Sequence, residues 1–191
     1  MDDSKSSTCT LPGYRTVNVI VSTRADRELS LEILAEKLSG CVYEPEIFPG
    51  LVYRRSDPKA TIIAFATGKI TSVGSKSEEA ARMSIVTTVS EIARIEGEIN
   101  VGNITTENVV ATVDVGRQID IDKVSGCVLK TIYEPEQFPG VIHRPKDNVV
   151  VIIFKSGKLV TTGSKSENEA KSTLCAASKT LKECGCLIEK T

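Results

Sequence analysis

The segment Tyr43-Glu-Pro-Glu-Ile-Phe-Pro-Gly50 recurs later in the chain as Tyr133-Glu-Pro-Glu-Gln-Phe-Pro-Gly140, at an offset of 133 − 43 = 90 residues. A second motif, Gly74-Ser-Lys-Ser-Glu78, recurs as Gly163-Ser-Lys-Ser-Glu167 at an offset of 163 − 74 = 89. The landmarks follow the same order both times, so residues near 16–96 and 106–187 are two copies of one unit. Two copies are too few for a solenoid, which needs about three. We therefore predict a pseudo-twofold molecule, a symmetry that suits a nearly twofold ligand such as duplex DNA.

The strands predicted in these copies are runs rich in β-branched and aromatic residues, bounded by turn signals. Asp57-Pro58 and Gly68 mark turns between successive strands of the first copy. The clearest predicted strands are 17–23, 52–54, 61–67, 69–73 and 108–115.

Helices are predicted after the first strand and at the end of each copy. Apolar residues at 31, 34, 35 and 38 fall on one face of a short helix, and the matching region near 120–128 is shorter and weaker. Ser75-x-x-Glu78 and Ser164-x-x-Glu167 have the pattern of capping boxes that begin two long helices. The apolar stripes of those helices are Ala81, Ile85, Val89 and Ile92 in one copy and Ala170, Leu174, Ala177 and Leu181 in the other.

One face of the predicted sheet has no obvious cover. Alternate strand residues point to opposite faces, so Ile62 and Ala64 oppose Thr61, Ile63 and Phe65. In the second copy Val151 and Ile153 likewise oppose Val150, Ile152 and Phe154. Four helices cover about one face, so a second apolar face would meet water unless further protein covers it in a sandwich. A contiguous exposed apolar sheet usually marks a binding surface.

Charge and composition restrict the function. The net charge is −1 and the pI about 6.0, which counts against a DNA-binding protein that relies on a broadly basic surface. No apolar run approaches the roughly 20 residues of a membrane span. The first residues lack the apolar core of a signal peptide, so we expect an intracellular protein with a flexible tail at 1–15.

The six cysteines are Cys9, Cys41, Cys127, Cys175, Cys184 and Cys186. They form no pair of C-x-x-C knuckles, and His143 is the only histidine, so we predict reduced thiols, no metal site and no cofactor.

Two other classes of function compete with DNA binding. An enzyme is disfavoured, because Gly68-Lys69 lacks the spacing of a phosphate-binding loop and His143 has no repeated nucleophile beside it. A protein-binding scaffold or regulator remains open, because an apolar sheet could also dock a protein and the acidic pI favours that use.

These motifs, together with the doubled hairpin Phe-x-x-Gly-Lys at 65–69 and 154–158, resemble the TATA-box-binding protein family over about 16–187. The resemblance implies an α+β fold in which two tandem pseudo-twofold copies form a saddle. Its curved antiparallel sheet would carry four main helices on the convex face. The copies would be a first repeat at 16–98 and a second at 99–191. The implied function is minor-groove binding and bending of TATA-box DNA, with no catalysis.

The resemblance also assigns roles to individual residues. Apolar wedges that kink the DNA would be Phe48 and Phe65 in one copy and Phe138 and Phe154 in the other. Asn18 and Asn108 would donate to minor-groove acceptors. The groove-facing neighbours would be Ile20, Ile63, Thr71, Val73, Val110, Ile152, Val160 and Thr162. Phosphate contacts would come from Arg54, Lys59, Lys69, Arg144 and Lys158.

The implied partners are transcription factor B and, through it, RNA polymerase. The contact residues would be Glu134, Glu136 and Gln137, just before the second-copy wedge, in a protein that binds DNA as a monomer. Three positions depart from the family pattern: Val73 replaces a threonine, Glu107 replaces a glutamine, and Asn148 stands opposite Lys59. The short tail and near-symmetric copies indicate an archaeal-like member.

Overall fold

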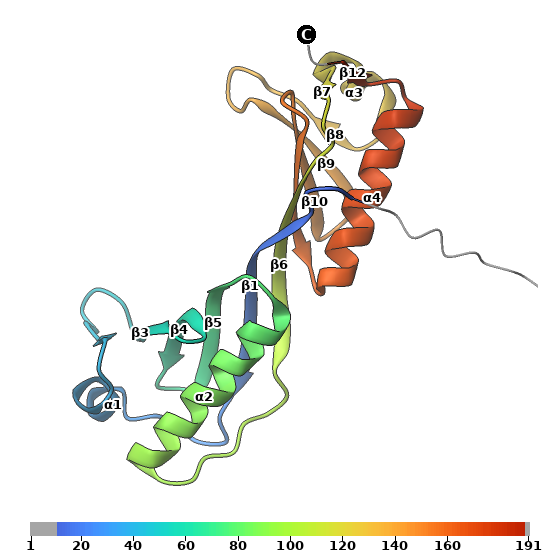
Figure 1. Cartoon of the computed structure of the whole chain (residues 1–191). Coiled ribbons are helices and arrows are strands. Elements are labelled where there is room, and N and C mark those ends of the chain that lie inside the picture. The colour runs from blue at the N-terminus through green and yellow to red at the C-terminus, as the bar shows by residue number, and fades with distance from the viewer. Residues whose placement is uncertain (1–10, 190–191) are drawn as a thin grey trace, which may run out of the picture. The chain divides into compact units, whose positions relative to one another are not determined.

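The computed structural model describes residues 11–189, so most of the predicted tail at 1–15 lies outside the described residues. The chain forms two compact units (Figure 1). The first unit consists of Thr16–Val109 and the short segment Lys165–Glu167, and the second consists mainly of Val110–Ser164 and the residues from Asn168 onward. No helix among the described residues has the length and apolarity needed to cross a membrane.

The elements follow one another in the same order in both halves of the chain, except that the second half has two further short strands, β7 and β12 (Figure 1). The first half contains β1 (Arg15–Arg24), α1 (Leu31–Lys37), β2 (Cys41–Val42), β3 (Gly50–Ser56), β4 (Lys59–Phe65), β5 (Lys69–Ser75) and α2 (Glu78–Glu96). The second contains β6 (Thr105–Asp114), β7 (Gln118–Ile119), α3 (Ile121–Cys127), β8 (Thr131–Ile132), β9 (Gly140–Lys146), β10 (Val149–Phe154), β11 (Lys158–Ser164), α4 (Glu167–Glu183) and β12 (Leu187–Ile188).

The strands of each unit are antiparallel neighbours. Their order is β2-β3-β4-β5-β1 in the first unit and β8-β9-β10-β11-β6 in the second. Consecutive strands pair through short turns, as hairpins do. Gly68 has a φ of +82°, and a Cβ there would lie 2.5 Å from the Arg27 carbonyl oxygen, so only glycine fits this turn.

One face of each sheet carries the core. In the first unit, Val19, Val21, Ile62 and Ile70 are fully buried. The facing stripe of α2 buries Ala81, Ile85 and Ile92, together with Ser84 and Thr88, while Val89 is half-buried. In the second unit all four predicted stripe residues of α4 are buried: Ala170, Leu174, Ala177 and Leu181. The predicted α+β class, with antiparallel strands and helices on one face of each repeat, is confirmed.

The predicted capping boxes are wrong by two residues. Ser75 ends β5, and the N-cap of α2 is Ser77, whose hydroxyl oxygen accepts from the Ala80 amide at 3.1 Å. The Glu78 carboxylate instead accepts from the Glu167 amide at 2.9 Å, and the Glu167 carboxylate accepts from the Glu78 amide at 3.4 Å. A carboxylate at a helix N-terminus satisfies free amides and the helix dipole. Each glutamate therefore supports the other helix, which a local motif cannot reveal.

The expectation of reduced thiols is also wrong for three of the described cysteines, because Cys127, Cys175 and Cys184 are each part of a disulfide. Cys127, the last residue of α3, is joined by a disulfide to Cys184, which follows α4. Their Cα atoms lie 6.3 Å apart, within the range that a disulfide spans. A separation of 57 residues hides this proximity from sequence spacing.

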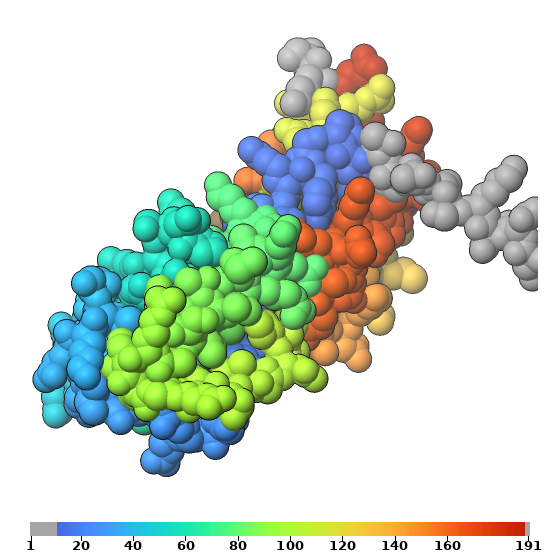
Figure 2. Space-filling view, turned by 60° about the horizontal axis from the view of Figure 1, so that its bottom comes forward, coloured from blue at the N-terminus to red at the C-terminus, as the bar shows by residue number. Residues whose placement is uncertain are grey.

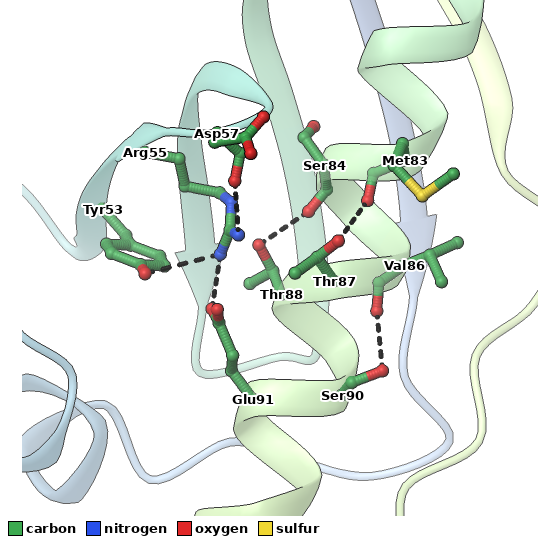
Figure 3. Close-up of polar contacts among 10 residues, drawn as sticks. All are labelled: Tyr53, Arg55, Asp57, Met83, Ser84, Val86, Thr87, Thr88, Ser90 and Glu91. Atoms are coloured by element: carbon green, nitrogen blue, oxygen red, sulfur yellow. Dashed lines mark hydrogen bonds and ion pairs between the residues drawn. The ribbon is translucent and has the colours of Figure 1, made fainter.

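A polar network links β3 to α2 in the first unit (Figure 3). The Arg55 guanidinium donates to the Glu91 carboxylate and to the Asp57 carbonyl oxygen, and it lies over the Tyr53 ring. The Arg55 side chain is only 5% exposed, so Glu91 is the partner that makes its burial tolerable.

The segment that follows α2 is hydrogen-bonded to the residues at the end of β1. Figure 2 shows α2 and this segment on the surface of the unit. The Asp26 amide donates to the Asn100 carbonyl oxygen at 2.9 Å, and the Gly102 amide donates to the Arg24 carbonyl oxygen at 2.9 Å. These bonds fix the end of β1, which carries candidate site residues.

Candidate nucleic-acid interface

Each unit presents one sheet face that its helices leave uncovered. Burial alternates along β4, where Ile62 and Ala64 are buried and Thr61, Ile63 and Phe65 are half-exposed. The same alternation along β10 buries Val151 and Ile153 and half-exposes their neighbours. The predicted second apolar face therefore exists in each unit, and no described residue of the same unit seals it. Among the described residues, this face is where the candidate site residues gather.

The candidate groove-facing residues form cross-strand rows. Ile63 on β4 stands opposite Val52 on β3 and Thr71 on β5. In the second unit Ile152 stands opposite Ile142 and Val160 in the same way. A further row pairs Thr61 with Val73, and its counterpart pairs Val150 with Thr162. Ile20 and Val110 are half-exposed on β1 and β6. The face of each unit thus consists of branched side chains, most of them apolar.

A phenylalanine pair borders each of these surfaces. The ring centroids of Phe48 and Phe65 lie 5.9 Å apart at 63°, and those of Phe138 and Phe154 lie 6.0 Å apart at 61°. Both pairs are edge-to-face, which is a favourable aromatic geometry. Phe48 is 38% exposed, so its ring is not a core residue of the free protein.

A glycine makes room for each aromatic pair. A Cβ on Gly50 would lie 2.7 Å from Phe48 Cε1 and 3.1 Å from Phe65 Cε1. A Cβ on Gly140 would lie 3.0 Å from Phe138 Cε1 and 3.0 Å from Ile152 Cγ2. The glycine of each Phe-Pro-Gly motif is therefore needed because the rings pass over its backbone, a role that the sequence did not reveal.

The turn that leads to each first phenylalanine is built identically. The Phe48 amide donates to the Glu44 carbonyl oxygen at 2.9 Å, and the Phe138 amide donates to the Glu134 carbonyl oxygen at 2.9 Å. Glu134, Glu136 and Gln137 are exposed along the second of these turns. The structure thus leaves the three candidate partner residues accessible.

The amide of Asn18 has a defined orientation. Its Oδ1 accepts from the Gly74 amide at 2.8 Å, so its NH₂ group remains to donate elsewhere. Asn108, the matching residue on β6, is half-exposed like Asn18. An NH₂ donor is the complement of the acceptors that A·T pairs present in the minor groove.

Five cations lie within these strands or at their first residues, and all are exposed: Arg54, Lys59, Lys69, Arg144 and Lys158. None of them takes part in an ion pair within residues 11–189. They supply local positive charge beside a sheet whose protein carries a net charge of −1.

The Glu107 carboxylate has partners within the protein. The Ser22 hydroxyl donates to Glu107 Oε1 at 2.7 Å, and Lys165 Nζ lies 3.6 Å from Glu107 Oε2. The hydrogen bond from Ser22, followed by the charge of Lys165, holds the pKa of Glu107 below its usual value. The carboxylate is therefore partly neutralised rather than directed unpaired toward a ligand.

Comparison with known proteins identifies this doubled arrangement. The sequence model described as "Transcription factor TFIID (or TATA-binding protein, TBP)" matches residues 13–95 and again residues 103–184. The chain belongs to the TATA-box-binding protein family. This family consists of DNA-binding transcription factors rather than enzymes, so the family excludes the enzyme alternative and gives the chain a general role in transcription.

Individual members of the TATA-box-binding protein family are similar over nearly the whole chain. The TATA-box-binding protein of Methanocaldococcus jannaschii is 44% identical over 175 residues, which cover 90% of this chain and 95% of that protein. TATA-box-binding protein E of Halobacterium salinarum is 38% identical over 174 residues, covering 89% of this chain and 94% of that protein. A solved structure of Methanococcus jannaschii TBP aligns with a TM-score of 0.75 at 42% identity, covering 90% of this chain and 99% of that one. The predicted archaeal-like relationship is confirmed.

The sequence patterns did not single out several residues of this apolar face or of its border. They are Gly50 and Gly140 under the aromatic pairs, and Val52 and Ile142 in the cross-strand rows. Strand parity could have found the row residues, because each lies two or four positions from a residue already assigned. No sequence signal could have found Ser22, whose bond to Glu107 joins residues 85 positions apart.

Proposed function

We propose that this TATA-box-binding protein binds A·T-rich promoter DNA in the minor groove and bends it. It would then present the complex to transcription factor B and, through it, to RNA polymerase, inside an archaeal cell. The functional halves would be the repeats at 16–98 and 99–191. The observation that carries this proposal is the duplicated half-exposed apolar face, bordered each time by an edge-to-face phenylalanine pair and by unpaired cations.

The apolar rows favour A·T base pairs for a physical reason. The minor-groove edge of a G·C pair carries the guanine amino group, which A·T pairs lack. Against Ile63 or Ile152 that amino group would be buried without an acceptor, at a cost of about 1–3 kcal/mol. The NH₂ group of Asn18 adds a donor for the acceptors that remain.

The phenylalanine pairs are suited to open a base step. Each pair places two rigid rings at the border of the apolar face, and one member of the first pair is already 38% exposed before any DNA is bound. Apolar wedges of this kind unstack base steps and bend the duplex toward the major groove. Because the rings are already positioned by the protein, little ordering would be needed on binding.

The test is end-to-end fluorescence energy transfer on two duplexes, one with a TATA element and one with a G·C replacement. We expect bending of the TATA duplex only. Five exposed cations would give a slope of log K against log salt of about −4 to −5. Failure of folded protein to bend either duplex, with or without transcription factor B, would refute the proposal and favour a protein-binding scaffold.

The partner surface can be tested separately. We expect replacement of Glu134, Glu136 and Gln137 by alanine to leave DNA bending unchanged, because these side chains are exposed and outside the apolar rows. Recruitment of transcription factor B to the bent complex should weaken. The matched control replaces the equivalent exposed residues Glu44, Glu46 and Ile47 of the first unit. Equal recruitment by both triple variants would contradict the assigned surface.

A further inference from the structure

Three cysteine sulfur atoms converge in the second unit, away from the apolar face. The Sγ atoms of Cys127, Cys184 and Cys186 all lie within 4.8 Å of one another. Cys127 is exposed at the end of α3, whereas Cys186 is fully buried just before β12. The disulfide between Cys127 and Cys184 leaves Cys186 as a third thiol directly beside it.

The turn that carries two of these thiols is rigid. The Gly185 amide donates to the Lys182 carbonyl oxygen at 3.0 Å, and the Cys186 amide donates to the Leu181 carbonyl oxygen at 2.9 Å. With a φ of +64° at Gly185, this is a Schellman turn that ends α4. The turn places Cys184 and Cys186 on either side of one glycine with both sulfur atoms toward Cys127.

The N-terminal end of α3 is hydrogen-bonded to the same turn. The Asp120 amide donates to the Cys186 carbonyl oxygen at 2.8 Å, and Lys123 Nζ donates to the Gly185 carbonyl oxygen at 3.2 Å. Leu187 then pairs with Ile119 between β12 and β7. The helix that supplies Cys127 and the turn that supplies the other two thiols are thus held together by bonds that do not involve sulfur.

The other copy shows that the fold does not require these cysteines. The offsets between the copies place Lys37 opposite Cys127 (127 − 90 = 37). They place Ile95 opposite Cys184 (184 − 89 = 95) and Gly97 opposite Cys186 (186 − 89 = 97). α1 and α2 form there without any thiol. The cluster is therefore an addition to the second unit.

We propose that Cys127, Cys184 and Cys186, when reduced, form a three-thiolate site for a thiophilic metal ion of the zinc class. A disulfide clasp alone needs two cysteines, whereas three converging sulfur atoms on a pre-formed scaffold are the donor set that such ions prefer. Ligands at tetrahedral Zn–S distances of about 2.3 Å stand about 3.8 Å apart. The Cys127 and Cys184 sulfur atoms would separate to that spacing once the disulfide opens, and Cys186 Sγ already lies within 4.8 Å of both.

The chemistry of the site follows from its donors. Opening the disulfide takes two electrons and two protons, which a phosphine reductant or a dithiol supplies as it is itself oxidised. The three thiols then lose their protons as the metal ion binds, because thiolate is the ligand form. Three protein ligands leave the fourth tetrahedral position for solvent, and Cys127 is exposed. The site is therefore open and its metal exchangeable.

The test uses the full chain, reduced with a phosphine and freed of metal by chelation. Cd²⁺ is titrated while the thiolate-to-metal charge-transfer absorption is followed, and Zn²⁺ affinity is measured against a chromogenic chelator. We expect one ion per chain. Cys127→Ser should weaken binding by more than about 10-fold, since loss of even an outer-shell partner costs about 10- to 100-fold. Because Cys127 is exposed, this variant should keep its fold.

Two further variants complete the experiment. Cys186→Ser, checked by circular dichroism, should lose affinity to a similar degree, whereas Cys41→Ser in the first unit should bind as the wild type does. The proposal is overturned if Cys127→Ser and Cys186→Ser both bind as the wild type does. It is also overturned if the reduced wild-type protein binds no metal ion, since the cysteines would then serve only as a disulfide pair. DNA bending is not needed for any of these measurements.

Discussion

Removing the ring of Phe138 should weaken DNA binding strongly while lowering the stability of the protein only slightly. In the free protein the ring makes an edge-to-face pair with Phe154 at 6.0 Å. Such a pair contributes about 0.5–1.5 kcal/mol. For a chain of this length about 1 kcal/mol lowers Tm by about 2–4 °C. On DNA the same ring would support an unstacked base step, which is worth a few kcal/mol. A loss of about 2–3 kcal/mol weakens Kd by about 30- to 150-fold.

The assay for Phe138→Ala combines thermal unfolding with energy transfer on a TATA duplex. The matched control is Leu129→Ala, which removes a large apolar side chain of the same unit that is 85% exposed and lies outside the rows. We expect a small Tm shift in both variants and loss of bending in Phe138→Ala alone. Wild-type bending and affinity in folded Phe138→Ala would refute the assignment of the ring as a wedge.

Three further changes test other contacts. Gly50→Ala should weaken DNA bending with little effect on Tm, because a Cβ there would lie 2.7 Å from the Phe48 ring and would displace it. Unchanged energy transfer on the TATA duplex would contradict this. Glu91→Ala should lower the free energy of unfolding in urea by about 3–5 kcal/mol, because it strands the buried Arg55 guanidinium, and a midpoint equal to the wild type's would rule out that role. The pKa of Glu107 in the folded protein is lowered, chiefly by the hydrogen bond from Ser22. The Glu107 carboxylate therefore stabilises the fold fully at pH values above its unfolded pKa near 4.5, and this stabilisation is lost as the pH falls through its folded pKa. When the unfolding midpoint is measured as a function of pH, Glu107→Gln should therefore lose less stability at acid pH than the wild type does. An identical fall of the midpoint in both proteins would show that the bond contributes nothing.

Local patterns in the sequence were sufficient for much of this protein. The doubled motifs around Tyr43 and Tyr133 determined that there are two copies, and strand parity placed Phe65 and Phe154 on the face away from the helices. Periodicity identified the buried stripes of α2 and α4. The repeat is visible when the two segments are compared directly, and strand parity and helix periodicity depend only on neighbours within a few residues, which is why a sequence can specify them.

The features that only the tertiary structure decided involve residues far apart in the chain. The reciprocal bonds of Glu78 and Glu167 span 89 positions, and these bonds, rather than the expected capping boxes, support the two long helices. The bond from Ser22 to Glu107 spans 85 positions, and the disulfide of Cys127 spans 57. Sequence spacing carries no information about such pairs, because their distances are set by how the strands and helices pack once the chain has folded.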